Sequence, residues 1–294
     1  LSSVSSCSLN IHPAMSENGC SNMPVTTRDA GTKLWQRRTT KLQLMIWGAW
    51  LVGVAIFVFC WELISDKTIW FFVTDAPTQA ADLGSRMFPP SWEYASVIWK
   101  PLWDTINIAT LGTLMALILA VPIAFCAARN TTPSAVFVRP VALFIIVASR
   151  SINSLIWALM LVTILGPGVF AGIIAIGLRS IGFCAKLLYE AIEEIEPGQT
   201  EAISATGASG AQVLSYGIVP QIMPAFAGIS VFRWDINIRE STVLGLVGAG
   251  GIGLQLSASI NELAWSRVCL ILIAIIATVI LSEWVSAKVR HAII

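Results

Sequence analysis

Long apolar runs without charge constrain this chain more than any other sequence feature. Residues 105–128 contain no charged side chain over 24 positions, and residues 44–61 contain none over 18 positions. A helix needs about 20 mostly apolar residues to cross the hydrocarbon core of a bilayer. Only 12% of the 294 residues are charged, whereas an average soluble domain has roughly 25%. The sequence therefore predicts an all-α polytopic membrane protein.

The remaining composition excludes several other classes of protein. A mean hydropathy of +0.76 is far too apolar for a disordered chain or a collagen-like fibre. The sequence also excludes a basic domain that binds nucleic acid, because its net charge is only +1. The six cysteines form no C-x-x-C pair, and His12 and His291 lie near opposite ends of the sequence. We therefore expect neither a disulfide framework nor a metal site.

The number of spans depends on one break. Residues 151–178 are long enough for a single span, but Gly166-Pro167-Gly168 is a strong helix-breaking signal, so we expect two helices there. About six transmembrane helices are then predicted, over residues 44–61, 105–128, 140–165, 168–189, a segment from Pro220 past Phe232, and 264–287.

The flanking charges predict the orientation. Cytoplasmic loops carry an excess of Lys and Arg, and an even number of spans returns both termini to the cytoplasm. The basic residues that support this orientation are Lys33, Arg37, Arg38, Lys41, Arg129, Arg139, Lys288 and Arg290. Residues 1–41, rich in Ser, Thr and Asn, are expected to form a disordered cytoplasmic tail before a transmembrane domain at 42–294. Aromatic residues within 66–98 indicate a helix on the outer membrane surface.

The longest polar stretch between spans is the predicted cytoplasmic loop at residues 190–220. We expect a break at Pro197-Gly198 and a short helix from Glu201 that Thr200 caps. Such a helix suits docking of a partner, because Gly207 allows another backbone to come close. A loop that merely connects two spans is the alternative, and the spacing leaves both open.

This loop resembles the EAA loop of ABC importer permeases. The matching residues are Glu201, Ala202, Gly207 and Pro220, whereas Ile203, Gly217 and Val219 depart from the pattern. The segments EAIEEIEPG, EAISATGAS, YGIVPQIMP and VLGLVGAGGIG resemble the phosphonate-importer permeases more narrowly, with the phosphite permeases as close relatives. The resemblance covers roughly residues 85–290, with a core at about 100–290.

The resemblance implies a MetI-like type I fold and a specific set of partners. Two copies of the permease form the pathway in the bacterial inner membrane. Two cytoplasmic ATPase subunits drive it, and a periplasmic or tethered binding protein delivers the substrate. The four matching loop residues become the positions that couple to the ATPase. ATP and magnesium are then used by the partner, and this chain itself needs no cofactor.

One motif invites a different interpretation. Residues 248–253, GAGGIG, match the dinucleotide-binding pattern G-x-G-x-x-G, but both flanks are of membrane length and no acidic residue follows at about 20 positions. We expect instead a helix break or gate near the outer end of the pathway, formed by Gly248, Gly250, Gly251 and Gly253. The sequence lacks the G-x-x-x-x-G-K-[ST] and H-E-x-x-H patterns, so neither ATP hydrolysis nor metalloprotease activity is expected.

Charged residues inside the spans are functional candidates, because a charge in a bilayer is costly. Arg150, Arg179 and Arg233 are expected to line a path for a small oxyanion, together with Asn237 and Arg239. Arginine suits such a ligand because its planar fork donates two hydrogen bonds to two oxygens.

A structural interpretation of the same arginines stays open. At 100° per residue, Arg233 shares a helix face with Glu240, and Asp235 is spaced i,i+4 from Arg239. Each arginine then pairs with a carboxylate or with backbone carbonyls. Arg150 and Arg179 are also placed so that they could snorkel to the interface.

The leading hypothesis is therefore the membrane subunit of an ATP-driven importer for phosphonate or phosphite. Importers for phosphate or a phosphate ester are the nearest alternatives. A membrane-embedded enzyme acting on lipid phosphates would need clustered nucleophiles or metal ligands, which the sequence does not show. An ion-coupled carrier usually shows inverted repeats, and no internal repeat is evident.

Overall fold

The computed structural model describes residues 25–27, 33–35 and 40–293, in a chain that forms two compact units, residues 1–76 and 77–294. Most of the expected tail at 1–41 lies outside the described residues. Its described residues form a small antiparallel pair, β1 (Val25–Thr27) and β2 (Lys33–Trp35), in which Val25 is opposite Trp35, and the first two residues of the helix that begins at Thr40.

The first unit is dominated by α1 (Thr40–Ser65). This helix is long and apolar enough to cross a membrane, and none of its span is buried inside the protein. Its exposed apolar side chains match a surface that faces lipid. After a turn, α2 (Trp70–Met87) begins with the exposed aromatic residues Trp70, Phe71 and Phe72.

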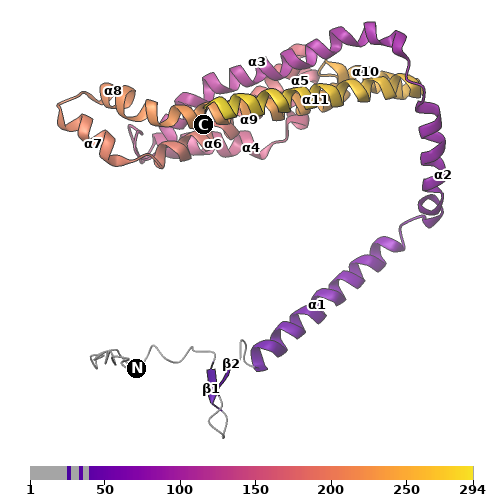
Figure 1. Ribbon diagram of the computed structural model, residues 1–294, viewed down its shortest axis with the longest axis horizontal. Coiled ribbons are helices and arrows are strands. Elements are labelled where there is room, and N and C mark those ends of the chain that lie inside the picture. The colour runs from indigo at the N-terminus through magenta and orange to yellow at the C-terminus, as the bar shows by residue number, and fades with distance from the viewer. Residues whose placement is uncertain (1–24, 28–32, 36–39, 294) are drawn as a thin grey trace, which may run out of the picture. The chain divides into compact units, whose positions relative to one another are not determined.

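The second unit is a helical bundle built around α3 (Ala95–Ala127), α6 (Val169–Glu193), α9 (Val219–Leu244) and α11 (Trp265–Ile293) (Figure 1). Small residues let these helices approach closely. A Cβ atom at Gly112 of α3 would lie 2.9 Å from Cγ2 of Ile176 of α6, and Ala109 and Ala116 on α3 are fully buried.

The segment expected to form the third span is broken in the middle. The helices α4 (Val138–Ser151) and α5 (Ser154–Leu165) meet at an angle of 87°. The expected helix over 140–165 is therefore two helices. The backbone becomes extended at Ile152, which ends α4, and Asn153 caps α5 by accepting a hydrogen bond from the Leu155 amide at 3.3 Å. The predicted break before α6 is confirmed, with φ of +86° at Gly166 and +155° at Gly168.

Short helices lie at the two ends of the bundle. At one end are α7 (Pro197–Ala205), α8 (Gly210–Gln212) and the π-helix η2 (Val213–Ile218), and at the other are η1 (Trp92–Tyr94) and α10 (Ile252–Asn261) (Figure 1). The 3-10 helix η3 (Gly245–Val247) joins α9 to the turn before α10.

The start of α7 differs from the expectation. The helix begins at Pro197, with Glu196 as its N-cap residue, rather than at Glu201 with Thr200 as the cap. Proline is favoured in the first helical turn because its φ is already helical and its missing N–H needs no partner there. The Thr200 hydroxyl instead donates to the Pro197 carbonyl at 2.7 Å.

Within the described residues, five helices are long and apolar enough to span a membrane, and the bent α4–α5 pair makes a sixth if it is counted as one span. This agrees with the expected all-α polytopic architecture of about six transmembrane helices.

Candidate functional sites

A buried polar cluster lies between α6 and α9, and Arg233 of α9 is at its centre. The Arg233 side chain is only 3% exposed. Its Nε donates to the Ser180 hydroxyl at 2.9 Å, and its guanidinium carbon lies 5.1 Å from the centre of the Phe183 ring. The guanidinium is therefore fixed on two sides by α6.

The cluster continues to α3 through an amide. The Ser180 hydroxyl donates to Oδ1 of Asn237 at 3.2 Å, and Nδ2 of Asn237 donates to the Thr113 hydroxyl at 2.7 Å. Thr113 in turn donates to the Ala109 carbonyl at 2.6 Å. Because Asn237 is fully buried, these bonds offset the cost of removing its amide from water.

Glu240 bridges two arginines. Its Oε1 lies 2.8 Å from Nη1 of Arg179, and its Oε2 lies 3.4 Å from Nη2 of Arg233. Arg179 also donates to the Ser154 hydroxyl at 3.2 Å and to Oδ1 of Asn153 at 3.5 Å. The three charged groups thus tie the broken span to α6 and α9.

Beside this cluster is an open cavity of about 550 Å³. The Arg179 side chain is 32% exposed and that of Glu240 is 17% exposed, so both are accessible there, whereas Arg233 lies behind them and does not line the cavity. The lining residues are Asn153, Ser154, Leu155, Arg179, Phe232, Ile236, Arg239, Glu240, Val243 and Leu244.

The sequence predicts four arginines along one path, but in the structure only two of them line the cavity. Arg179 and Arg239 line the cavity, and Arg233 is in the buried pairing with Glu240 that the structural interpretation anticipated. Arg150 is exposed on α4 and does not line the cavity. The neighbouring Ser149 hydroxyl accepts from the Gly182 amide at 3.0 Å, which places Arg150 near the level of Arg179.

The expected i,i+4 pair on α9 is confirmed. Arg239 forms an ion pair with Asp235, and the Ser282 hydroxyl of α11 donates to Asp235 at 2.8 Å. Sequence reasoning did not find Asn153 and Ser154, although an asparagine directly before an apolar run is a helix-start signal.

The EAA-type residues lie on and around α7. Glu201 and Ala202 are exposed on the helix, and Gly207 follows it with φ of +82°. Pro220 is in the first turn of α9. Apart from its own chain neighbours, no atom of the described chain lies within 4 Å of a Cβ built at Gly207, so this surface is open to a partner.

Gly217, where the family pattern has Ile, is the contact between α7 and η2. A Cβ atom there would lie 3.3 Å from Cγ2 of Thr200 and 3.4 Å from Cδ1 of Ile203. The glycine therefore lets α7 rest closely on the π-helix that leads into α9.

Three polar contacts anchor the segment that leads into α7. Oε1 of Glu193 accepts from the Arg129 amide at 2.9 Å and lies 3.6 Å from Nη2 of Arg139. The Glu196 amide donates to Oε1 of Gln221 at 3.3 Å. The segment before α7 is therefore held by the α3–α4 connection on one side and by α9 on the other.

The glycine-rich turn lies at the far end of α9. Gly248, Gly250 and Gly251 have φ of +89°, +81° and +75°, and Gly253 lies in the first turn of α10. The Ile252 amide donates to the Thr105 hydroxyl at 2.8 Å. The turn is a close-packed junction of α9, α10 and α3.

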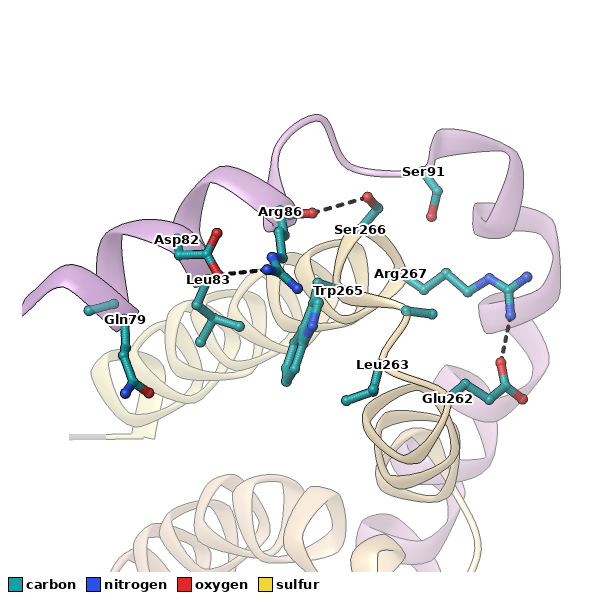
Figure 2. A pocket seen from close by; sticks show the side chains of 12 residues that line it. Gln79, Asp82, Leu83, Arg86, Ser91, Glu262, Leu263, Trp265, Ser266 and Arg267 are labelled. Atoms are coloured by element: carbon teal, nitrogen blue, oxygen red, sulfur yellow. Dashed lines mark hydrogen bonds and ion pairs between the residues drawn. The ribbon is translucent and has the colours of Figure 1, made fainter. Parts of the chain in front are cut away.

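A larger hollow of about 1060 Å³ lies at the same end (Figure 2). It is bounded by the second half of α2, on which Arg86 pairs with Asp82 at 2.9 Å. Its other boundary is the α10–α11 turn, where Glu262 pairs with Arg267 at 2.9 Å. Figure 2 shows the Trp265 ring between these two elements.

Comparison with known proteins adds an independent line of evidence. The model of the family described as "binding-protein-dependent transport system inner membrane component" matches residues 120–291. A phosphite transport system permease protein of Stutzerimonas stutzeri is 37% identical over 241 residues, which are 82% of this chain and 86% of that protein. A phosphate-import permease protein of Mycolicibacterium smegmatis is 40% identical over 205 residues, 68% of this chain and 38% of that protein.

Among solved structures, an inward-facing methionine ABC transporter aligns with a TM-score of 0.61 at 19% identity, covering 69% of this chain and 99% of the aligned chain. An amino acid ABC transporter aligns with a TM-score of 0.58 at 18% identity, covering 68% and 95%. At these identities the likeness concerns the fold.

Proposed function

Because the chain belongs to the family of binding-protein-dependent transport system inner membrane components, we propose that it carries a small phosphorus oxyanion through the membrane as the permease subunit of an ATP-driven importer. It has the MetI-like type I permease fold. Its relatives include phosphite and phosphate-import permeases, and a putative phosphonate transport permease of Escherichia coli is 41% identical over 117 residues. The shared substrate chemistry is a tetrahedral phosphorus oxyanion.

The observation that carries the proposal is the cavity lined by Arg179 and Arg239 within the spanning bundle. An anion that leaves water loses its hydration, and a guanidinium replaces part of that hydration with two directed, charge-assisted hydrogen bonds. Arg179 already makes such bonds to a carboxylate and a hydroxyl there. The Arg179 side chain is also 32% exposed, so part of the guanidinium is accessible to an oxyanion in the cavity.

The exposed surfaces support the partners that this family of importers implies. The open face of α7 around Glu201 and Gly207 is the docking position for a cytoplasmic ATPase subunit, which uses ATP and magnesium. The hollow beside Trp265 lies at the opposite end of the bundle and receives the substrate-delivering protein. A second copy of the chain completes the pathway.

This arrangement requires α7 and both termini to be in the cytoplasm of a bacterial cell, with α2 lying on the outer surface of the inner membrane. The basic residues around the spans support that orientation. The exposed Trp70, Phe71 and Phe72 at the start of α2 are typical of residues at a membrane interface.

Uptake measurements test the proposal. The chain is expressed with its ATPase and binding protein, and cells are given phosphite, methylphosphonate or phosphate in separate arms. We expect uptake in at least one arm, and we expect Arg179→Gln to lower it by about tenfold or more, the equivalent of 1.4 kcal/mol or more.

Lys186→Gln is the matched control, because Lys186 lies two turns along α6 from Arg179, outside the cavity, and pairs with Glu190 at 3.5 Å. Equal membrane abundance of the variants is checked first. Absence of uptake in all three arms would reject the substrate class, and normal uptake by Arg179→Gln would reject the cavity as the path.

A further inference from the structure

The carboxylate of Glu240 occupies the place where an anion in the cavity would meet Arg179. Its Oε1 is 2.8 Å from the Arg179 guanidinium, and the residue lines the cavity beside it. A carboxylate and a phosphorus oxyanion compete for the same fork of N–H donors. An incoming oxyanion therefore contacts Arg179 fully only when Glu240 withdraws.

The same carboxylate has a second partner to which it can withdraw. Its Oε2 faces Arg233, which is 3% exposed and is held by Ser180 and the Phe183 ring. Arg233 is thus fixed in place whether or not Arg179 is occupied. Loss of the Arg179 contact leaves Glu240 paired rather than stranded in a poorly solvated site, which would be costly.

We propose that Glu240 is an internal competitor for Arg179 that keeps the affinity of the permease for its oxyanion low. This inference rests on the proposed function, since it assumes an anion in the cavity. A transport path must bind its substrate strongly enough to admit it and weakly enough to release it. An accessible arginine in surroundings of low dielectric would otherwise hold an anion tightly.

A purely structural Glu240 makes a different prediction. If it serves only to neutralise Arg233, its removal lowers the amount of folded protein and leaves anion affinity unchanged. If it competes for Arg179, its removal makes anion binding stronger and the release of the anion slower. The two roles are separated by measuring anion binding directly.

The test uses the transporter purified in detergent with its ATPase partner. Thermal stability is titrated with phosphite, and separately with phosphate and with sulfate, for the wild type and for Glu240→Gln. We expect the phosphorus oxyanion to stabilise Glu240→Gln at a concentration about tenfold lower than the wild type, which corresponds to about 1.4 kcal/mol. Glu283→Gln, an exposed acidic position on α11, is the control and should titrate like the wild type.

Two double variants complete the design. Glu240→Gln with Arg179→Gln should lose the anion effect, since the freed guanidinium is then absent. Glu240→Gln alone leaves the buried charge of Arg233 unpaired, which could lower the amount of folded protein. Arg233→Gln with Glu240→Gln removes that charge as well, and this double variant should still bind the anion more tightly than the wild type.

Several results would overturn the inference. The inference fails if Glu240→Gln needs the same anion concentration for stabilisation as the wild type. It also fails if the double variant Arg233→Gln with Glu240→Gln needs the same concentration as the wild type. Another such result is stabilisation that persists without Arg179, because the anion would then bind elsewhere. A gain with sulfate alone would also count against a phosphorus oxyanion. Uptake by the wild type is measured in parallel. Absence of uptake would reject the proposed function, whereas normal uptake with unchanged anion binding by Glu240→Gln would reject only the role of Glu240.

Discussion

The glycine junction at the end of α9 that lies away from α7 gives a prediction whose sign and size follow from the packing. A Cβ atom at Gly253 would collide with the carbonyl oxygen of Thr242 and lie 2.8 Å from the Cα of Gly245. Both obstacles are backbone atoms, so neither can swing aside as the end of a flexible side chain does. Overpacking of a filled interior costs roughly 1–3 kcal/mol, and we expect Gly253→Ala to lie near the upper end.

Gly228 of α9 is the matched control, because it is also helical but, apart from the adjacent residues and backbone of its own helix, no atom of the described chain lies within 4 Å of a Cβ built there. Gly228→Ala should stabilise by about 0.5–1 kcal/mol, since alanine loses less backbone entropy in a helix. The two Gly→Ala changes therefore act in opposite directions.

Thermal unfolding in detergent, followed by the loss of monodisperse transporter, measures both variants. One kcal/mol shifts Tm by roughly 2–4 °C in a chain unit of this size, so Gly253→Ala should unfold at least about 5 °C below Gly228→Ala. A Gly253→Ala transporter that is as stable as Gly228→Ala would refute the close packing of α10 on the end of α9.

The remaining predictions concern α7, the α10–α11 turn and the orientation. Gly207→Asp should abolish uptake at normal membrane abundance. Aspartate is one of the few residues that tolerate a positive φ such as the +82° of Gly207, its Cβ meets no other part of the described chain, and the obstruction falls on the ATPase; normal uptake in cells would show that α7 is only a connector. Leu263→Gly should raise Tm, because Leu263 has φ of +55° at a helix end where glycine is favoured; an unchanged or lower Tm would contradict this. A cysteine at Ser209 should resist a membrane-impermeant thiol reagent in intact cells, whereas one at Gln79 should react; the reverse labelling would contradict the orientation.

The spans and their main break were predictable because they depend on local sequence. Charge-free runs of bilayer length and the Gly166-Pro167-Gly168 break act through the chain itself. The bend at Asn153 was missed because no proline or glycine marks it. It is held by the capping bond to the Leu155 amide and by the hydrogen bonds from Arg179 to Asn153 and Ser154. The start of α7 was misplaced because Pro197-Gly198 was interpreted as a break, although proline also begins helices.

The polar cluster was only partly predictable for a similar reason. Helical periodicity predicts that Arg233 and Glu240 share one face of α9, and it predicts the pair of Asp235 with Arg239. The pairing of Arg179 with Glu240 joins residues on two helices, and it depends on how α6 crosses α9. No spacing rule within one helix carries that information.

Because α9 is one continuous helix, it connects the end of the bundle that carries α7 with the end that carries the glycine junction. Its 26 residues extend about 39 Å at about 1.5 Å per residue. If it pivots at the glycine junction, a tilt of about 5° moves the end beside α7 by about 3 Å and Arg233 by about 1.4 Å, but Glu240 by only about 0.5 Å. A small push on α7 would thus separate Arg233 from Ser180 before it disturbs the contact of Glu240 with Arg179, so the order in which the cluster opens is set by distance from the pivot.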